Sequence, residues 1–547
     1  MKNDTLTQLK WECYRLPGVS APDAWREMIE RQLSHQDSPY EFDVYRTSIR
    51  AWLKKSPTIS VPQSDLKCRN AYRLQRVAFG GDRTETLIGL SIARVVFEPG
   101  SSSPSFLSAA ELFQKGQYPA ALCHRPMLGG INDLIGYLAE SAGLSQLVQH
   151  REWESEDLSE QIVYRSSRQA SSLASLTSGS GLSKNLLQLV RSEKAIKPAA
   201  ICMGLLGGSV RQLSKAMEIA RLVNQVLREW GCPGNMVDLG GGDTIDDFLT
   251  NDAVGMPIIL IPLEGKLGDR PPSEALVWMK YLNERRIAFQ ICSTSSNPIY
   301  SRHGLAMAIL AKVGGLHFCT ELLQTDEFRR CWFIGLDLGR GGIDDARIAV
   351  ITLTDSSGRF LAYWRAIKNK TESLPLQLLI EGIRWVVDKA HSIDASRNVV
   401  LIRDGRIPKD ERVEDYATAM NGLPFTLVEY AKGGAPLIHC DHDQPSPGTL
   451  VQPTKAAYST FYPCLSPQDG ILTSPVKFSM PFNSMKFSPS QMGKFLTALC
   501  HAPTLSYQPA STPAPIQWAN GLAKISYTDL QFSGWSHLPN HTVDLRT

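Results

Sequence analysis

Two aspartates in this sequence stand where an apolar strand would end. Asp337 follows the run WFIGL, and Asp404 follows the run VVLIR. Burying a carboxylate costs several kcal/mol unless a cation compensates, and a hard divalent ion held by aspartates does so directly. Each aspartate alone is better explained as a turn or helix cap. Two of them after two such runs favour a site for a divalent metal ion.

The segment between the two aspartates has the pattern of an open α/β sheet. Residues 346–353 and 359–367 are apolar enough for strands, and residues 374–389 have the apolar spacing of a helix. The strand that carries Asp404 follows. In such sheets the polar site lies at the carboxyl ends of parallel strands. We therefore expect Asp337 and Asp404 on neighbouring parallel strands.

Length and composition indicate a globular protein of several domains. The chain has 547 residues, of which 43% are hydrophobic and 20% charged, which is enough for three or four domains. We find no apolar run long enough to span a bilayer and no signal-peptide core at the N-terminus, so we expect a cytoplasmic protein without a membrane partner. A net charge of +3 neither requires nor excludes a nucleic-acid partner.

Zinc and disulfide chemistry are not indicated. The chain has 11 cysteines, an odd number, and they form no C-x-x-C pair, so we expect reduced core residues. The run HCDHD at 439–443 contains metal-binding residue types, but its adjacent spacing suits no standard zinc geometry. We interpret this run as a loop.

The N-terminal region, residues 1–190, shows secondary structure but little chemistry, and we leave it as an unassigned α+β region. Residues 43–55 have helical spacing, whereas residues 86–97 fit a strand or a helix. The serine-rich residues 166–183 are the best candidate for a linker.

A second α/β unit follows, from about residue 196 to 319. Its expected strands are 199–205, 257–262 and 287–292, and its expected helices are 210–230 and 274–286. The run GGGD at 240–243 fits neither common phosphate-binding pattern, so we expect a turn. A further helix within 297–315 ends at Lys312. This lysine either complements the helix dipole or projects into a pocket for phosphate.

Five segments in order resemble a prokaryotic Argonaute. They are Gln290 at a strand end, AKVGG at 311–315, FIGLD at 333–337, LIRDGR at 401–406 and PAPIQWAN at 513–520. The resemblance covers residues 196–547 and implies a Rossmann-like MID domain at 191–325 and an RNase H-like PIWI domain at 326–547. We see no PAZ domain in the N-terminal third, which implies a PAZ-less or reduced, short-type member.

The resemblance implies a catalytic tetrad that binds two divalent ions, Mg²⁺ or Mn²⁺. The matching positions, in family order, are Asp337, Glu372, Asp404 and Asn520. Glu381 is a second, weaker choice for the glutamate. Of these residues, Asp337, Asp404 and Asn520 are the expected metal ligands, with Asn520 contributing a neutral amide oxygen. Asn520 is alternatively the cap of a helix that starts near Gly521.

The resemblance also implies residues that hold the guide and the target. At the 5′ end of the guide, Gln290 and Lys312 match the family, whereas Glu274 and Trp278 stand where it has a Tyr-Lys pair. Candidates near that end are also Lys280, Tyr281 and the C-terminal Thr547. Whether a 5′ phosphate or a 5′ hydroxyl is preferred stays open. Candidates for contacts with the nucleic-acid backbone are Arg403, Arg406, Lys409 and Lys432, each of which is equally explained as a solvated charge.

Two functions follow from the resemblance. The first is a guide-directed endonuclease that cleaves the paired target strand by two-metal phosphodiester hydrolysis, in defence against foreign DNA such as plasmids or phage. The alternative is a catalytically silent, guide-dependent sensor that recruits or activates a separate effector. We favour the nuclease because Asp337, Glu372 and Asp404 are all acidic. The sequence does not distinguish DNA from RNA as guide or target.

Overall fold

The protein is described here by a computed structural model, in which the chain divides into two compact units. Unit 1 is Met1–Asp157 with Ala431–Ser479, and unit 2 is Leu158–Tyr430 with Met480–Thr547. The structure describes residues 9–19, 24–45, 47–61, 65–77, 86–105, 125–141, 147–149, 153–165, 170–172, 200–232, 234–239, 245–250, 256–264, 277–279, 281–282, 287–295, 298–316, 320–340, 347–368, 373–440, 445, 448–453, 458–461, 475–502, 504 and 510–523.

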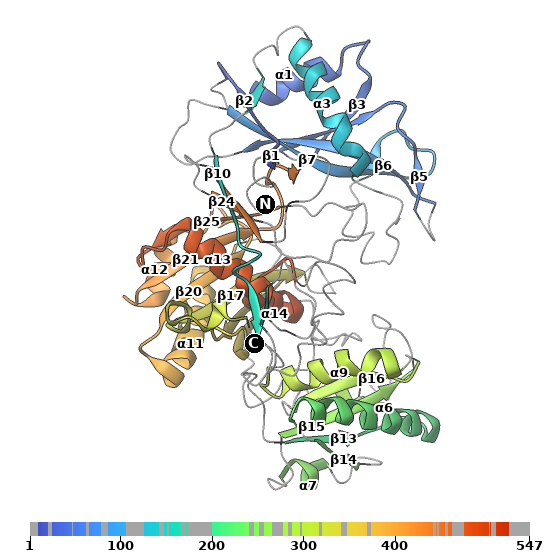
Figure 1. Ribbon diagram of the computed structural model, residues 1–547, viewed down its shortest axis with the longest axis vertical. Helices are drawn as coiled ribbons and strands as arrows, with labels where there is room; N and C mark the ends of the chain where they lie inside the picture. Colours follow the sequence, from blue (N-terminus) through green and yellow to red (C-terminus); the bar gives the residue numbers. More distant parts are fainter. Residues whose placement is uncertain are drawn as a thin grey trace. The chain divides into compact units, whose positions relative to one another are not determined.

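Unit 1 contains an antiparallel sheet with the strand order β3-β4-β6-β7-β2-β9. Helices α1 (Ala24–Leu33) and α3 (Arg125–Glu140) lie along this sheet (Figure 1). Their apolar side chains and those of the sheet form one buried core. The strands are β2 (Cys13–Leu16), β3 (Tyr40–Tyr45), β4 (Ser48–Leu53), β6 (Lys67–Val77), β7 (Thr86–Phe97) and β9 (Val148–Gln149), with β5 (Ile59–Ser60) and β8 (Pro104–Ser105) paired to β6 and β7.

The helix predicted at residues 43–55 is wrong, because this segment forms the hairpin of β3 and β4. Its aromatic and β-branched residues, such as Tyr45, Ile49 and Trp52, favour extended backbone. β4 also pairs with β6, which buries it along nearly its whole length. Residues 86–97, which fitted either element, form strand β7.

Residues 431–479 pack with the N-terminal segment, although they fall inside the region predicted as PIWI. β1 (Leu9–Trp11) pairs with β22 (Ile438–Cys440), so His439 lies in a strand and the loop predicted there is wrong at this residue. His439 Nε2 contacts Glu12 Oε1 at 2.6 Å, and both side chains are buried. Strands β10 (Trp153–Asp157), β23 (Thr449–Pro453) and β24 (Tyr458–Phe461) form the rest of this part.

The first part of unit 2 is a parallel sheet with the order β14-β13-β15-β16. The strands are β13 (Ile201–Leu205), β14 (Gly234–Asp238), β15 (Met256–Leu263) and β16 (Phe289–Ser293), and the helices are α6 (Val210–Glu229), α7 (Ile245–Thr250) and α9 (Pro298–Lys312). Helices α6 and α9 pack on the sheet through a common apolar core. These elements confirm the predicted strands at 199–205 and 257–262 and the predicted helix at 210–230.

The predicted linker at 166–183 is in part a hairpin. β11 (Val163–Arg165) pairs with β12 (Ala170–Ser172), and the rest of that segment lies outside the described residues, as do the predicted turn at 240–243 and most of the predicted helix at 274–286.

The second part of unit 2 is a mixed sheet with the order β25-β21-β20-β17-β18-β19. Its strands are β17 (Cys331–Arg340), β18 (Arg347–Thr354), β19 (Phe360–Lys368), β20 (Asn398–Asp404), β21 (Phe425–Ala431) and β25 (Val476–Asn483). β17, β18 and β19 are antiparallel neighbours, whereas β20 is parallel to both β17 and β21. The predicted order of two strands, a helix and a parallel return strand is confirmed.

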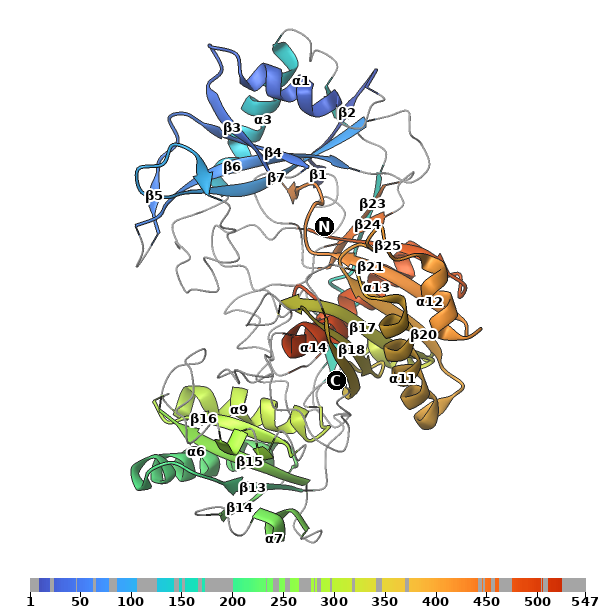
Figure 2. The same cartoon turned by 180° about the vertical axis from the view of Figure 1, so that it is seen from behind.

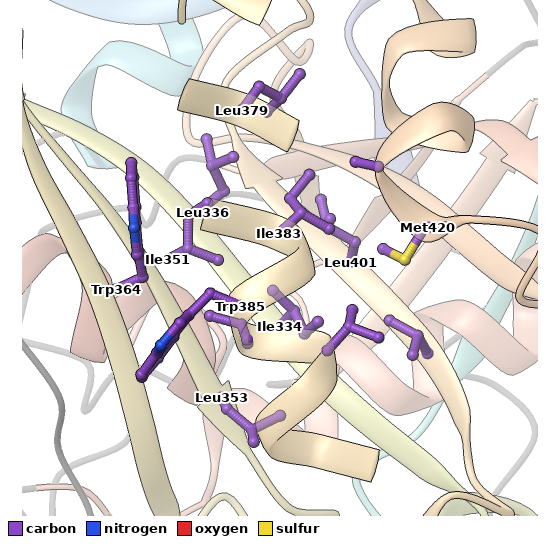
Figure 3. Close-up of a cluster of buried hydrophobic side chains, with 14 of the residues drawn as sticks. Ile334, Leu336, Ile351, Leu353, Trp364, Leu379, Ile383, Trp385, Leu401 and Met420 are labelled. Carbon is purple, nitrogen blue, oxygen red and sulfur yellow. The ribbon is translucent and has the colours of Figure 1, made fainter. Parts of the chain in front are cut away.

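Helices pack against this mixed sheet from opposite sides. The helices are α11 (Leu376–Asp394), α12 (Val413–Met420), α13 (Pro489–Cys500) and α14 (Ala514–Ala523), with the short α10 (Asp326–Arg329) before β17. Figure 2 shows β17 and β18 between α11 and α14. On the α11 side, Leu336 and Leu401 lie in one apolar cluster with Ile383 of α11 (Figure 3). The face of β17 that carries Leu336 and the face of β20 that carries Leu401 therefore point toward α11.

Helix α14 lies against the opposite face of β17 because two glycines make room for it. A Cβ atom on Gly335 would lie 2.4 Å from the backbone of Pro515, and one on Gly339 would lie 2.5 Å from Ala523 Cβ. Thr352 of β18 adds a hydrogen bond, since its Oγ1 donates to Pro515 O at 2.8 Å. The contact with α14 therefore runs along β17 from Gly335 to Gly339.

We expect Gly335→Ala to lower the free energy of unfolding by roughly 1–3 kcal/mol, because the added methyl group forces α14 away from β17. Urea unfolding measures this. Gly304→Ala is the matched control, since nothing lies within 4 Å of a Cβ at this position in α9 and alanine is the better helix former. Equal stability of the two variants would contradict the close packing of α14 on β17.

Two predictions from composition concern cysteines and membranes. The cysteines of the described residues are free thiols, namely Cys13, Cys68, Cys202, Cys232, Cys292, Cys331, Cys440 and Cys500. Over the same residues, no helix combines the length and apolar character that crossing a membrane requires.

Candidate active site

Asp337 projects from β17 toward α14. Side chains alternate between the two faces of a strand, so Asp337 shares its face with Gly335 and Gly339, the two glycines that contact α14. Leu336 points the other way, into the cluster beside α11. The carboxylate is 7% exposed, and its Oδ1 accepts a hydrogen bond from the amide of Leu338 at 2.8 Å.

Asp404 projects from β20 toward the same side of the sheet. Leu336 pairs in parallel register with Arg403, which places Asp337 and Asp404 at the next position of the two strands. Asp404 also pairs with Tyr430 of β21, whose hydroxyl donates to Ser511 O, three residues before α14. Paired residues of a sheet point to the same face. Both carboxylates therefore lie on the α14 face of adjacent strands, which are about 4.8 Å apart.

Asn520 is an interior residue of α14. The helix starts at Ala514, so the alternative that Asn520 caps a helix starting near Gly521 is wrong. Between the contacts at Gly335 and Gly339, β17 rises about 13 Å, and α14 advances about 12 Å from Pro515 to Ala523. Helix and strand thus run side by side, and the half-buried Asn520 lies within the stretch that flanks Asp337.

Glu372 falls outside the described residues, which resume at Ser373. From Ser373 the chain leads directly into α11. Glu381, the second choice, lies within α11 and is exposed. It follows Leu379 and precedes Ile383, which both pack against the sheet on the side away from α14.

The donor set of Asp337, Asp404 and Asn520 fits a hard divalent cation. Two carboxylates and an amide offer oxygen ligands, which Mg²⁺ and Mn²⁺ prefer. Within the described residues, no three His, Cys, Asp or Glu side chains form a metal-binding group. A complete site for two ions therefore needs the amide of Asn520 or a carboxylate from residues beyond those described.

Gln290 of β16 and Lys312 of α9 lie together, but both are buried. Lys312 Nζ donates to Phe289 O at 3.0 Å and to Gln290 Oε1, while Gln290 Nε2 donates to Ile291 O at 2.9 Å. Lys312 has no exposed surface. Its amino group thus contacts the end of its own sheet, at Phe289 O and Gln290 Oε1, and does not project into a pocket for phosphate. Burial holds the pKa of Lys312 well below its usual value.

This burial predicts a pH dependence of stability that Lys312→Met removes. A lysine whose pKa is lowered by folding binds more protons in the unfolded chain, so stability rises with pH between the lowered pKa and the usual 10.5. We expect a slope of up to about 1.4 kcal/mol per pH unit in the wild type relative to Lys312→Met. Urea unfolding from pH 7 to 10 measures it. Parallel curves would contradict a buried, depressed lysine.

The remaining candidates for the guide end are mostly outside the described residues. Glu274, Lys280 and Thr547 are not described. Trp278 is half-buried, lies beside Gly207 at the end of β13, and contacts Tyr281 at a ring separation of 5.9 Å.

The prediction that Arg403 contacts the nucleic-acid backbone is wrong, because its side chain is only 3% exposed and is held inside the sheet. It points to the α11 side, as the alternation with Asp404 requires. Arg406 and Lys409 follow on the surface and are exposed, and Lys432 is an exposed residue of unit 1.

Arg403 instead belongs to a buried cluster that the sequence reading missed. Arg403 Nη2 donates to Glu411 Oε1 at 3.0 Å, and Arg403 Nε donates to Glu411 Oε2 at 3.2 Å and to Tyr416 Oη at 3.0 Å. The Tyr416 hydroxyl donates to Glu411 Oε2. We call Arg403, Glu411 and Tyr416 the buried arginine cluster. The strand alternation that placed Asp404 on one face was the signal that Arg403 lies on the other.

Solved structures with the same arrangement identify the fold. The Argonaute of Marinitoga piezophila, in complex with 5′ OH guide RNA, matches with a TM-score of 0.64 at 11% identity, over 94% of this chain and 86% of that chain. Clostridium butyricum Argonaute, bound to a guide DNA (5′ deoxycytidine) and a 19-mer target DNA, matches with 0.63 at 12% identity, over 95% and 87%. Drosophila Piwi matches with 0.56 at 9% identity, over 94% and 86%. The fold is Argonaute-like.

The predicted fold class is confirmed, because the Argonaute-like fold is mixed α/β and its PIWI domain is RNase H-like. The likeness also reaches further than the sequence resemblance, which covered residues 196–547. Coverage of 94% of the chain includes most of residues 1–190 as well. No protein-family model matches this sequence, and no curated protein sequence matches it.

Proposed function

We propose that this chain is a guide-directed endonuclease, which binds a small guide nucleic acid and cleaves the target strand paired to it. The observation that carries the proposal is the placement of Asp337 and Asp404 on one face of two adjacent parallel strands. Two carboxylates on one face of neighbouring strands offer the oxygen ligands that a hard divalent cation prefers. The Argonaute-like fold supplies the context, since solved neighbours hold guide and target strands.

The chain's own residues would position two divalent ions, Mg²⁺ or Mn²⁺. Asp337 and Asp404 would hold them from adjacent strands, and Asn520 would add a neutral oxygen from α14. A carboxylate at Glu372 completes the ligand set in this proposal. When bound, such ions lower the pKa of a coordinated water and stabilise the leaving oxygen of a phosphodiester. Base pairing with the guide then selects the bond that is cleaved.

We further propose that the guide end does not depend on a phosphate held by Lys312. Lys312 Nζ already donates hydrogen bonds to Phe289 O and Gln290 Oε1 within the protein. The Marinitoga piezophila structure holds a guide with a 5′ hydroxyl, so a phosphate is not required in every protein with this fold. Guides with a 5′ hydroxyl should therefore load as well as guides with a 5′ phosphate.

A cleavage assay with the purified chain tests the proposal. Guides of DNA and RNA, each with a 5′ hydroxyl or a 5′ phosphate, are loaded and mixed with labelled complementary DNA or RNA in Mn²⁺. We expect one product cut at a fixed distance from the guide end, abolished by a chelator. Tight target binding without any product would overturn the nuclease and favour the guide-dependent sensor that acts through a separate effector.

We also propose that the target in the cell is foreign DNA such as a plasmid. Expression of the chain should then speed the loss of an unselected plasmid from growing cells. Plasmid retention equal to that of cells without the chain would contradict this role.

A further inference from the structure

We propose that Glu411 is a positioning residue for Asp404, one of the carboxylates of the proposed metal site, and this inference rests on the nuclease proposed above. Glu411 is 5% exposed and lies in the chain between β20 and α12. Its two carboxylate oxygens receive hydrogen bonds from three different segments: β20, α12 and the residues just before α11. One side chain thereby ties together the elements around the site.

The first of these ties holds the end of β20. Arg403 meets Glu411 in a bidentate pair, with Nη2 to Oε1 at 3.0 Å and Nε to Oε2 at 3.2 Å. Arg403 Nη1 also donates to Asp404 O at 3.2 Å. The backbone that carries the Asp404 carboxylate is therefore fixed by the guanidinium group, and the guanidinium group is fixed by Glu411.

The second tie holds the chain just after Glu372. The amide of Leu374 donates to Glu411 Oε1 at 2.7 Å, and Ser373 Oγ donates to Asp410 Oδ2 at 3.4 Å. The residues just before α11 are therefore fixed by the same carboxylate that holds Arg403.

The hydrogen bonds of the buried arginine cluster suit this task. Burial raises the pKa of Tyr416, so its hydroxyl stays a donor. A buried ion pair adds little net stability compared with apolar residues of similar volume, because both charges must be desolvated. Its directional hydrogen bonds, in contrast, fix position.

A second ion pair, between Asp355 and Arg359, provides a matched control for the loss of a buried carboxylate. Asp355, in the turn between β18 and β19, is 6% exposed. It accepts from Arg359 Nε at 2.9 Å and from the amides of Ser357 and Arg359 at 2.9 and 3.0 Å. Asp355→Asn therefore removes a comparable charge from the same sheet without touching Leu374 or Asp404.

The test compares Glu411→Gln and Tyr416→Phe with Asp355→Asn and the wild type. We expect Glu411→Gln to lower the single-turnover cleavage rate constant about 10- to 100-fold, the usual effect of removing a partner that orients a metal ligand. Tyr416→Phe, the milder variant, should act in the same direction. Affinity for guide and target should stay unchanged, the Mn²⁺ concentration for half-maximal rate should rise, and Asp355→Asn should cleave like the wild type.

Amide hydrogen exchange of the peptide containing Leu374 gives a second readout that does not need cleavage. Faster exchange in Glu411→Gln and not in Asp355→Asn supports the inference. A rate constant for Glu411→Gln equal to that of Asp355→Asn, or unchanged exchange at Leu374, overturns it. If the wild type cleaves nothing, the proposed nuclease is wrong. The role of Glu411 is then decided by comparing Glu411→Gln with the wild type in amide exchange at Leu374 and in Mn²⁺ affinity.

Discussion

Replacing Asp404 with asparagine is expected to abolish target cleavage while binding of guide and target stays near wild type. Asparagine keeps the size of the side chain but removes the charge that holds a divalent ion beside Asp337 in the proposed site. Loss of one member of a catalytic set commonly costs several orders of magnitude, so we expect at least about a 10³-fold fall in the single-turnover rate constant. Filter binding of labelled target measures the unchanged affinity.

Asp388→Asn is the control for this prediction, because Asp388 is an exposed carboxylate on α11, a helix of the same sheet. It should cleave like the wild type. Cleavage by Asp404→Asn at the wild-type rate would exclude the paired-aspartate site, and loss of target binding in that variant would assign Asp404 to binding and not to chemistry.

Replacing Arg403 with alanine is expected to lower the free energy of unfolding by about 3–5 kcal/mol, the cost of leaving a buried charge without its partner. Glu411 is 1% exposed in its side chain and accepts two hydrogen bonds from Arg403. Urea unfolding measures the loss. The double variant Arg403→Met with Glu411→Leu should recover most of it, since apolar residues of similar size fill the same space without buried charge.

Arg406→Ala serves as the control for Arg403→Ala, because Arg406 is exposed and should change stability by no more than about 0.5 kcal/mol. The two variants also distinguish a buried Arg403 from the nucleic-acid contact that the sequence predicted for it. A phosphate contact at Arg403 requires weaker target binding with stability intact. That result would contradict the buried arginine cluster.

The placement of the two aspartates was predictable from the sequence because it depends on local rules. Apolar runs before Asp337 and Asp404 mark buried strands, and the intervening helix requires a parallel return strand. The expectation that Asp337 ends its strand is wrong, because β17 continues to Arg340. The end of α9 at Lys312 was predicted from the two glycines that follow it at 314 and 315. These features need no knowledge of distant residues.

The features that the sequence did not give depend on distant partners. Glu411 lies in an irregular segment, and nothing local indicates that it meets Arg403 and the amide of Leu374. The same holds for β1 and β22, whose pairing joins residues about 430 positions apart. Lys312 is a third case, because only the folded sheet shows that its ammonium group turns back to Phe289 O.

The hairpin at β3 and β4 was missed because of competing periodicities. A short segment rich in apolar residues matches both the helical and the extended pattern, and its partner strand decides between them. Here the partners are β3 and β6, which pair with β4 on either side, and the side chains of β4 are buried on both faces of the sheet.

Anomalous diffraction from crystals of the protein loaded with guide and target in Mn²⁺ is the most direct test of the paired-aspartate site. We expect a manganese peak within ligand distance of carboxylate oxygens from both Asp337 and Asp404, on the α14 side of the sheet. No peak there, or a peak bound by neither aspartate, would contradict it.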